Sequence, residues 1–266
     1  MLKFFLAPFL LFWRHRVLLL QTTRNEIRGR YAGSVLGLAW LVLYPLFFLA
    51  SYALVYLYIF KVRFGLFDSN EYVVLIFCGL IPFLGFAEGL SLGVGSVTSN
   101  ANLIKNTLFP IELIPVKAVM VTQSTQVVGT GLLFITLVLL GKISTWALLF
   151  PLIWLAQILF TIGLVWILSS LNVFLRDLQN VIAVVILMLM MISPIAYTAD
   201  MVPETLRPYL SINPLYYMIV ASQDCLMLGR FPREGAFWVL ILLAGVSFWT
   251  GHWFFSRMKR VFADNV

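Results

Sequence analysis

Six long apolar stretches separated by short polar segments constrain the fold of this chain more than any other feature of its sequence. They run about 35–60, 72–97, 117–140, 146–171, 181–197 and 236–255, and none of them alternates apolar and polar residues. A helix rises ~1.5 Å per residue, so about 17–25 residues cross the hydrocarbon core of a bilayer. Backbone groups in lipid must pair with one another, and barrel strands alternate, so these stretches predict transmembrane helices.

The composition supports a multi-pass membrane protein and argues against other classes. Of the 266 residues, 62% are hydrophobic and only 11% are charged, which is far more apolar than a soluble core requires. The two cysteines, Cys78 and Cys225, predict neither a disulfide framework nor a metal site. The net charge of +7 does not indicate nucleic-acid binding, because the basic residues are scattered at the ends of the apolar stretches.

We therefore expect an all-α integral membrane protein with six transmembrane helices. An N-terminal interfacial and cytosolic segment (1–34) precedes the transmembrane domain (35–256), and a cytosolic tail (257–266) follows it. Within the first segment, Phe4 to Trp13 is too short for a span and has no cleavage site after it, so it predicts an interfacial helix. Most Lys and Arg residues fall in the pieces that six spans place inside, so both termini are expected in the cytosol.

The segment 198–235 decides between six and seven spans. Its apolar part, Leu215–Leu228, is shorter than a span and contains Gln223 and Asp224. That length fits a re-entrant or interfacial helix better than a transmembrane one. A seventh span would also move the basic residues of the tail outside, so we predict a re-entrant helical segment before the last span.

The polar stretch from Ser99 to Pro115 lies between two predicted spans. Ser99 or Asn100 can cap a helix start, and Leu103, Ile104 and Leu108 then share one face. Pro110 ends the helix and Pro115 fits the first turn of the next. The stretch thus predicts a short amphipathic helix on the cytosolic side. It either connects the two spans or docks a soluble partner, and physical chemistry alone does not separate these interpretations.

Motifs for catalysis are absent from the sequence. It contains no G-x-x-x-x-G-K-[ST], no H-E-x-x-H and no G-x-S-x-G, and its two histidines, His15 and His252, are far apart. We therefore expect no enzyme activity, no metal and no cofactor in this chain. Any ATP that drives it must bind another polypeptide.

An acidic residue inside one of the apolar stretches favours a function but also has a structural interpretation. Glu88 is the one acid well inside a predicted span, and an intramembrane carboxylate is costly unless it faces protein or water. The glycines around it, from Gly85 to Gly95, favour a helix-packing role instead. A polar patch also interrupts the third stretch at 122–126.

An aromatic residue recurs every four positions along the first stretch. The column consists of Trp40, Tyr44, Phe48, Tyr52, Tyr56 and Phe60. Flat aromatic faces suit the apolar C–H faces of sugar rings, and phenol hydroxyls can hydrogen-bond to sugar hydroxyls. The alternative is an aromatic packing seam with ordinary interfacial residues at its two ends.

The segment before the first span is basic and contains spaced glycines. Arg24, Arg28 and Arg30 either set orientation or bind a lipid-linked pyrophosphate, because guanidinium groups bind phosphate bidentately. The spacing of Gly29, Gly33 and Gly37 suits either helix packing or a hinge.

Short motifs follow one another in order along the chain and carry a family resemblance. They are Arg30 to Gly37 (R-Y-A-G-S-V-L-G) with Trp40 and Pro45, N-x-x-L-I-K-x-x-x-F-P-x-E-x-x-P from Asn100, Arg176-Asp177, Ser193-Pro194-Ile195 and Asn213-Pro214. Together they resemble the permease subunits of ABC-type polysaccharide exporters, the O-antigen, capsule and teichoic-acid group of the type-2 ABC exporters. The resemblance covers about residues 24–256 and is greatest to O-antigen permeases.

The resemblance implies the membrane subunit of an exporter that moves a lipid-linked polysaccharide across the bacterial inner membrane. It implies a homodimer with two P-loop ATPase subunits that hold the ATP and Mg²⁺. The implied coupling residues are Asn100, Leu103, Ile104, Lys105, Phe109, Pro110 and Glu112, and the implied glycan channel is lined by Tyr44, Phe48, Tyr52 and Tyr56. The alternatives are a type-2 ABC exporter of drugs or small lipids, and an ATP-independent transporter. The latter would need paired intramembrane charges or inverted repeats, and the sequence offers neither.

Overall fold

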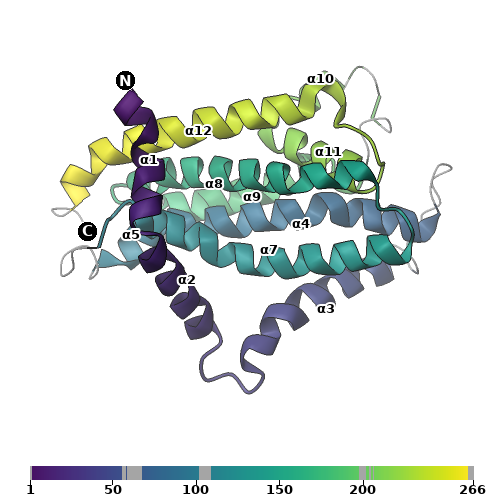
Figure 1. The fold of residues 1–266 in the computed structure, drawn as a ribbon, viewed down its shortest axis with the longest axis horizontal. Helices are drawn as coiled ribbons and strands as arrows, with labels where there is room; N and C mark the ends of the chain where they lie inside the picture. Colours follow the sequence, from purple (N-terminus) through teal and green to yellow (C-terminus); the bar gives the residue numbers. More distant parts are fainter. Residues whose placement is uncertain are drawn as a thin grey trace.

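Every regular element in the described part of the chain is a helix, as Figure 1 shows. The computed structural model describes residues 2–55, 58, 68–101, 109–197, 202, 203, 205 and 207–262. The longer helices are α1 (Leu2–Arg14), α2 (Arg16–Arg30), α3 (Trp40–Leu54), α4 (Ser69–Val94), α7 (Leu113–Leu139), α8 (Phe150–Asn172), α9 (Leu178–Ile192), α11 (Pro214–Leu226) and α12 (Ala236–Met258). The shorter ones are η1 (Gly37–Ala39), α5 (Ser96–Ser99), η3 (Thr145–Leu149), α10 (Arg207–Leu210), η5 (Arg233–Gly235) and η6 (Lys259–Val261). The predicted all-α class is therefore confirmed.

Five helical segments of the described chain are long and apolar enough to cross a membrane. They are Gly37–Leu54, Asn70–Val94, Leu113–Leu139, Thr145–Asn172 and Ala236–Val261. Each coincides with one of the six predicted stretches. The remaining stretch, 181–197, corresponds to α9, whose 15 residues span only ~22 Å at ~1.5 Å per residue. Five of the six spans therefore have matching helices, and the sixth stays a prediction.

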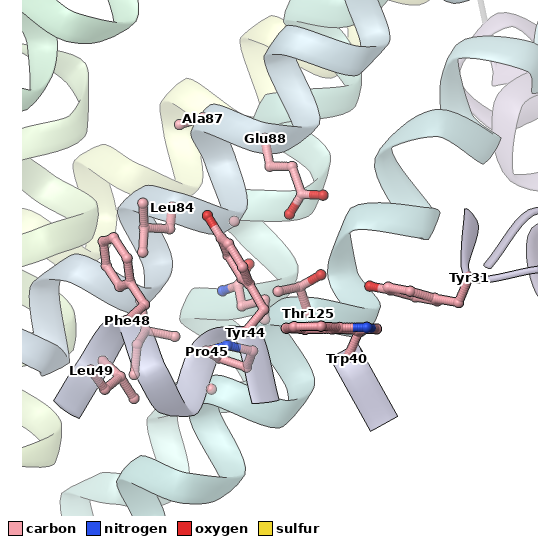
Figure 2. Close-up of a pocket in the computed structure, with 14 residues that line it drawn as sticks. Tyr31, Trp40, Tyr44, Pro45, Phe48, Leu49, Leu84, Ala87, Glu88 and Thr125 are labelled. Carbon is pink, nitrogen blue, oxygen red and sulfur yellow. The ribbon is translucent and has the colours of Figure 1, made fainter. Parts of the chain in front are cut away.

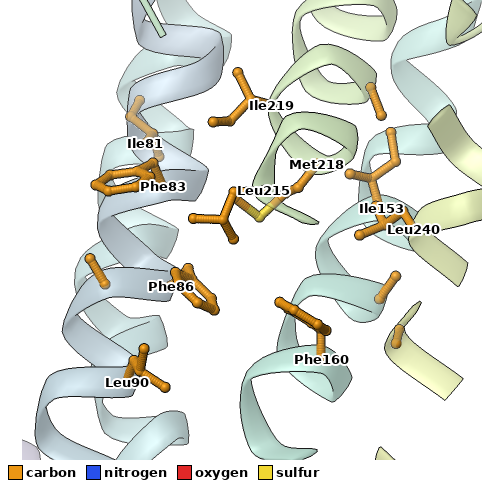
Figure 3. Packing of buried hydrophobic residues seen from close by; sticks show 14 of the residues in the cluster. Ile81, Phe83, Phe86, Leu90, Ile153, Phe160, Leu215, Met218, Ile219 and Leu240 are labelled. Atoms are coloured by element: carbon orange, nitrogen blue, oxygen red, sulfur yellow. The ribbon is translucent and has the colours of Figure 1, made fainter. Parts of the chain in front are cut away.

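Helices α4 and α8 form the centre of the bundle, with α7, α11 and α12 packed around them (Figure 1). Figure 3 shows the interior between them, where Phe86 of α4 faces Phe160 of α8 with ring centroids 5.9 Å apart. The closest approach joins α8 to α12. A Cβ on Gly163 would lie 2.3 Å from the Ser247 carbonyl carbon, and one on Gly251 would lie 2.2 Å from the Gly163 oxygen. Small residues let helix backbones meet in this way within a membrane.

The segment predicted to be re-entrant contains a short buried helix, α11, of 13 residues. The Oδ1 atom of Asn213 caps it by accepting from the Leu215 N–H at 3.0 Å. Asp224, which is fully buried, pairs with Arg230 at 2.9 Å and with Arg233 at 3.3 Å. These contacts hold the loop after α11 against its last turn. The helix is too short for a seventh span, and its re-entrant depth stays a prediction.

Helices α2 and α3 form a V whose vertex points away from the other helices (Figure 1). The turn at the vertex has two residues with positive φ, Gly33 at +81° and Gly37 at +50°, a conformation that favours glycine. A Cβ added to Gly29, Gly33 or Gly37 would meet nothing within 4 Å. Gly33 and Gly37 therefore form a turn, whereas Gly29 lies in the last turn of α2 and packs against no described helix of this chain.

The N-terminal helices pack across one end of the bundle. Phe9 and Phe12 of α1 contact Phe248 of α12, with ring centroids 5.5 and 6.1 Å away. In α2, Glu26 forms an ion pair with Lys117 of α7 at 2.6 Å. This ion pair holds α2, which is one arm of the V, against α7.

Candidate functional site

A cavity of about 510 Å³ lies between α3, α4 and α7 (Figure 2). Its walls combine aromatic, aliphatic and polar side chains. They are Tyr31, Trp40, Tyr44, Pro45, Phe48, Leu49, Ile81, Leu84, Gly85, Ala87, Glu88, Thr125, Gln126 and Gly129. The volume falls within the ~300–1,000 Å³ of small-molecule sites in proteins.

The aromatic wall comes from α3 and is part of the predicted column. Tyr44 and Phe48 stack with ring centroids 6.4 Å apart, and Phe48 lies 4.8 Å from Tyr52 in a tilted arrangement. Trp40, Tyr44 and Phe48 line the cavity, and Tyr44 is 62% exposed. Phe48 and Tyr52 also pack against the hydrophobic core, so the column serves both as a wall and as a packing seam. Tyr56 and Phe60 lie outside the described residues.

Glu88, one of the residues that line the cavity, forms an ion pair. The Nη1 atom of Arg30, at the end of α2, lies 3.0 Å from Oε1 of Glu88 in α4. Their side chains are 28% and 35% exposed. The sequence presented Glu88 as an isolated acid and Arg30 as one of three surface bases. The fold joins them, because α2 packs against α7, where Glu26 pairs with Lys117, and α7 packs against α4.

Tyr31 lies beside this ion pair and lines the same cavity. Partial burial raises the pKa of its phenol, Arg30 opposes the rise, and the charge of Glu88 adds to it. The phenol therefore keeps its proton at neutral pH and can donate a hydrogen bond into the cavity.

Gln126 forms a fixed polar group on the opposite wall. Its amide pairs reciprocally with the amide of Gln157 in α8, with N···O distances of 3.0 and 2.9 Å. Gln157 also donates to the Pro82 carbonyl at 3.0 Å. A Cβ on Gly85 would lie 1.7 Å from Gln126 Oε1, so glycine is required for α7 to approach α4 here. Thr125 and Gln126 belong to the polar patch at 122–126, which was the only sequence signal for them.

Arg24 and Arg28, the other two arginines predicted to contact a lipid-linked pyrophosphate, lie away from the cavity lining. Arg24 and Arg28 are exposed on α2, and neither has a described contact with the cavity walls. The structure therefore places Arg30 at the cavity and separates it from the two remaining arginines.

The segment 99–115, which contains the implied coupling residues and is called the coupling segment below, is described by the structure only at its two ends. Asn100 follows α5, and its Nδ2 donates to the Ser96 carbonyl at 2.8 Å, so its described bond closes a helix end and does not cap a helix start. Leu103, Ile104 and Lys105 lie outside the described residues. Phe109 and Pro110 are half-buried.

Glu112 is anchored within the chain. Its carboxylate pairs with Lys259 of η6, and its carbonyl accepts from Trp166 Nε1 of α8 at 3.0 Å. These contacts join the end of the coupling segment to α8 and to the C-terminal end of the bundle. No local pattern indicated the partner of Glu112, because Lys259 lies 147 positions away.

Among the described residues, no group of three His, Cys, Asp or Glu side chains could hold a metal ion. The cavity instead offers aromatic faces, a carboxylate, an amide, hydroxyls and a guanidinium group. These groups suit a ligand with polar, hydroxylated rings and an anionic end.

Comparison with known proteins places the chain among transporters. The sequence model described as ABC-2 type transporter matches residues 17–227. Two proteins of Klebsiella pneumoniae, each named O-antigen export system permease protein RfbA, are 32% and 30% identical to it, over 93% of this chain and 94% of each relative. The RfbA protein of Myxococcus xanthus is 25% identical over 96% of this chain and 97% of its own, and a polysialic acid transport protein KpsM of Escherichia coli is 24% identical over 77% and 79%.

Proposed function

Because the chain belongs to the ABC-2 type transporter family, we propose that it is the membrane subunit of an ATP-driven exporter of a lipid-linked polysaccharide of the O-antigen kind. The observation that carries this proposal is the match to three O-antigen export permeases over nearly their whole length. The cavity chemistry agrees with a glycan substrate. A multi-pass location in the bacterial inner membrane follows from the family and from the apolar helices.

The alternatives have less support. An exporter of drugs or small lipids belongs to the same broad family, but the relatives named above carry the names of polysaccharide exporters and transporters. An ATP-independent transporter does not fit the family. Arg30 and Glu88 do form a charge pair, but Arg30 ends α2, which precedes the first span, and so does not supply a paired charge from a second span.

A separate ATPase subunit is expected to dock on the segment 99–115. The support is its place between α5 and α7, its position on the cytosolic side in the six-span topology, and the anchoring of its end. Glu112 contacts both α8 and η6, so a force on this segment would reach two helices of the bundle. Coupling in this arrangement is mechanical, because an element that moves as a rigid body carries its packed neighbours with it.

We infer that two copies of the chain form the complete path. The cavity of one chain, about 510 Å³, suits a few sugar rings at most and not a polymer. The outward faces of α3 and α9 are apolar and exposed, as Phe47 of α3 and Met188 and Met191 of α9 illustrate. A two-fold arrangement would place such faces together and enlarge the space between the chains.

Deletion of the gene tests the proposed function. The deletion strain should lose its surface polysaccharide and accumulate the lipid-linked form inside, and the wild-type gene should restore export. Affinity-tagged protein should also capture a P-loop ATPase from the same cells, and Phe109→Ala or Pro110→Ala should weaken that capture without loss of membrane insertion. A deletion strain with normal surface polysaccharide would overturn the proposal.

A further inference from the structure

We propose that the cavity between α3, α4 and α7 is a discrete binding site for the phosphate-linked end of the substrate. The sugar ring next to the phosphate occupies the cavity, and the phosphate replaces Glu88 as the partner of Arg30. The inference rests on the proposed function and deepens it, because it assigns a bound position to one part of the substrate.

The walls suit a sugar ring. Trp40, Tyr44 and Phe48 present aromatic rings from α3 on one side, and Figure 2 shows the rings of Tyr44 and Trp40 between α3 and the bundle. The C–H faces of a pyranose pack on such rings, and the hydroxyls at its edge then require polar partners. Thr125 and Gln126, on the facing helix α7, supply these partners.

The polar wall is held in place before any ligand arrives. Gln126 is 3% exposed, and its pairing with Gln157 sets the position of its amide. An amide has two donor hydrogens and two acceptor lone pairs, so the reciprocal pair leaves one of each for a ligand. A polar group fixed by a second layer of contacts binds at a smaller entropic cost than a free one.

The ion pair is placed for exchange with a phosphate. Glu88 lies six residues before the end of α4, about 9 Å along the helix, on the side that the six-span topology turns to the cytosol. Arg30 lies at the end of α2, in the segment 1–34 that is predicted to be interfacial and cytosolic, where lipid head groups would meet it. A pyrophosphate linkage presents two negative charges and four non-bridging oxygens to a guanidinium group, whereas a carboxylate presents one charge and two oxygens. Its arrival would free the Glu88 carboxylate to accept hydrogen bonds from sugar hydroxyls.

A hydrocarbon chain is a poorer occupant of the same cavity. It would cover the remaining donor and acceptor of the Gln126 amide and the hydroxyl of Thr125 without pairing them, and it would remove water from the Arg30–Glu88 ion pair. Buried polar groups without partners are costly, and charged ones are more so. The cavity chemistry therefore favours the sugar over the lipid tail.

Cysteine labelling tests the site in the full-length chain with its ATPase subunit in native membrane vesicles. Thr125→Cys, in a chain with Cys78→Ala and Cys225→Ala, reacts with a small neutral thiol reagent. Vesicles come from cells that make the lipid-linked polysaccharide and from cells blocked at the transfer of the first sugar. Labelling in the first should be about tenfold slower if the site is nine-tenths occupied, because only free sites react. Ala87→Cys, on the α4 wall, is a second probe.

A matched position separates occupancy from general access. Val127→Cys lies two residues along α7, is 54% exposed and does not line the cavity, so it should react equally in both kinds of vesicle. Equal rates at both cavity positions would overturn the proposal. Equal and slow rates would mean that a hydrocarbon chain or a second copy fills the cavity. The exporter proposal itself is tested separately, because it fails if the deletion strain keeps its surface polysaccharide.

Variants of Glu88 test the polar contact itself. Glu88→Leu should abolish the protection of Thr125→Cys, and Glu88→Gln, which still accepts hydrogen bonds, should keep most of it. Glu71→Leu is the matched control, because it breaks a second ion pair, with Lys142 at 2.8 Å, away from the cavity. Full protection in the Glu88→Leu protein would assign the Arg30–Glu88 pair to packing alone and overturn its role in binding.

Discussion

Exchange of the charges at Glu112 and Lys259 separates two roles for the coupling segment. Glu112→Lys removes a carboxylate whose side chain is 13% exposed and brings a second cation against Lys259, whose side chain is 38% exposed. Exposed ion pairs contribute about 0–1 kcal/mol, and breaking a buried one costs about 3–5 kcal/mol. This pair lies between these limits, so we expect a loss of about 2 kcal/mol.

The loss should be visible in the thermal stability of the purified protein. For a chain of this size, about 2 kcal/mol corresponds to a decrease in Tm of roughly 4–8 °C. Lys259→Glu should show a similar decrease. The double variant Glu112→Lys/Lys259→Glu restores opposite charges, so it should recover most of the Tm and, if the contact transmits movement to the bundle, most of the export as well.

The double variant also distinguishes this contact from docking on the ATPase. If Glu112 binds the partner subunit directly, the double variant still presents a cation there, and neither ATPase capture nor export returns. A Glu112→Lys protein with wild-type Tm would refute the intramolecular role of the pair. Recovery of Tm without recovery of export would assign the pair to stability and Glu112 to docking.

Three further predictions follow from the packing and the topology. Gly163→Leu should cost about 1–3 kcal/mol, because its Cβ meets the Ser247 backbone, whereas Gly245→Leu meets open space and should leave Tm unchanged. In a chain without native cysteines, one introduced at Asn70 should react with an impermeant thiol reagent in spheroplasts, and one at Asn265 only after the inner membrane is opened; reaction of both in intact spheroplasts would exclude the six-span topology. Tyr44→Ala should reduce surface polysaccharide at wild-type Tm, because its ring is mostly exposed, and unchanged export with a collapsed Tm would assign the ring to packing.

Much of the fold could be predicted from local sequence properties. Apolar stretches such as 72–97 and 117–140 predicted helices because a backbone in lipid has to satisfy its own hydrogen bonds, whatever lies beside it. The shortness of Leu215–Leu228 correctly predicted a helix too short to span. The family resemblance, carried by motifs such as the one from Asn100, was confirmed by the family match over residues 17–227.

The candidate site needed the tertiary structure. Arg30 and Glu88 lie 58 positions apart, and no periodicity links them. They meet because α2 packs against α7, where Glu26 pairs with Lys117, and because α7 packs against α4, where Gly85 leaves room for Gln126. Gln126 became a fixed wall of the cavity only through Gln157 of a third helix. A helix forms from the residues along it, but a cavity depends on the tilt and separation of several helices, which their contacts set together.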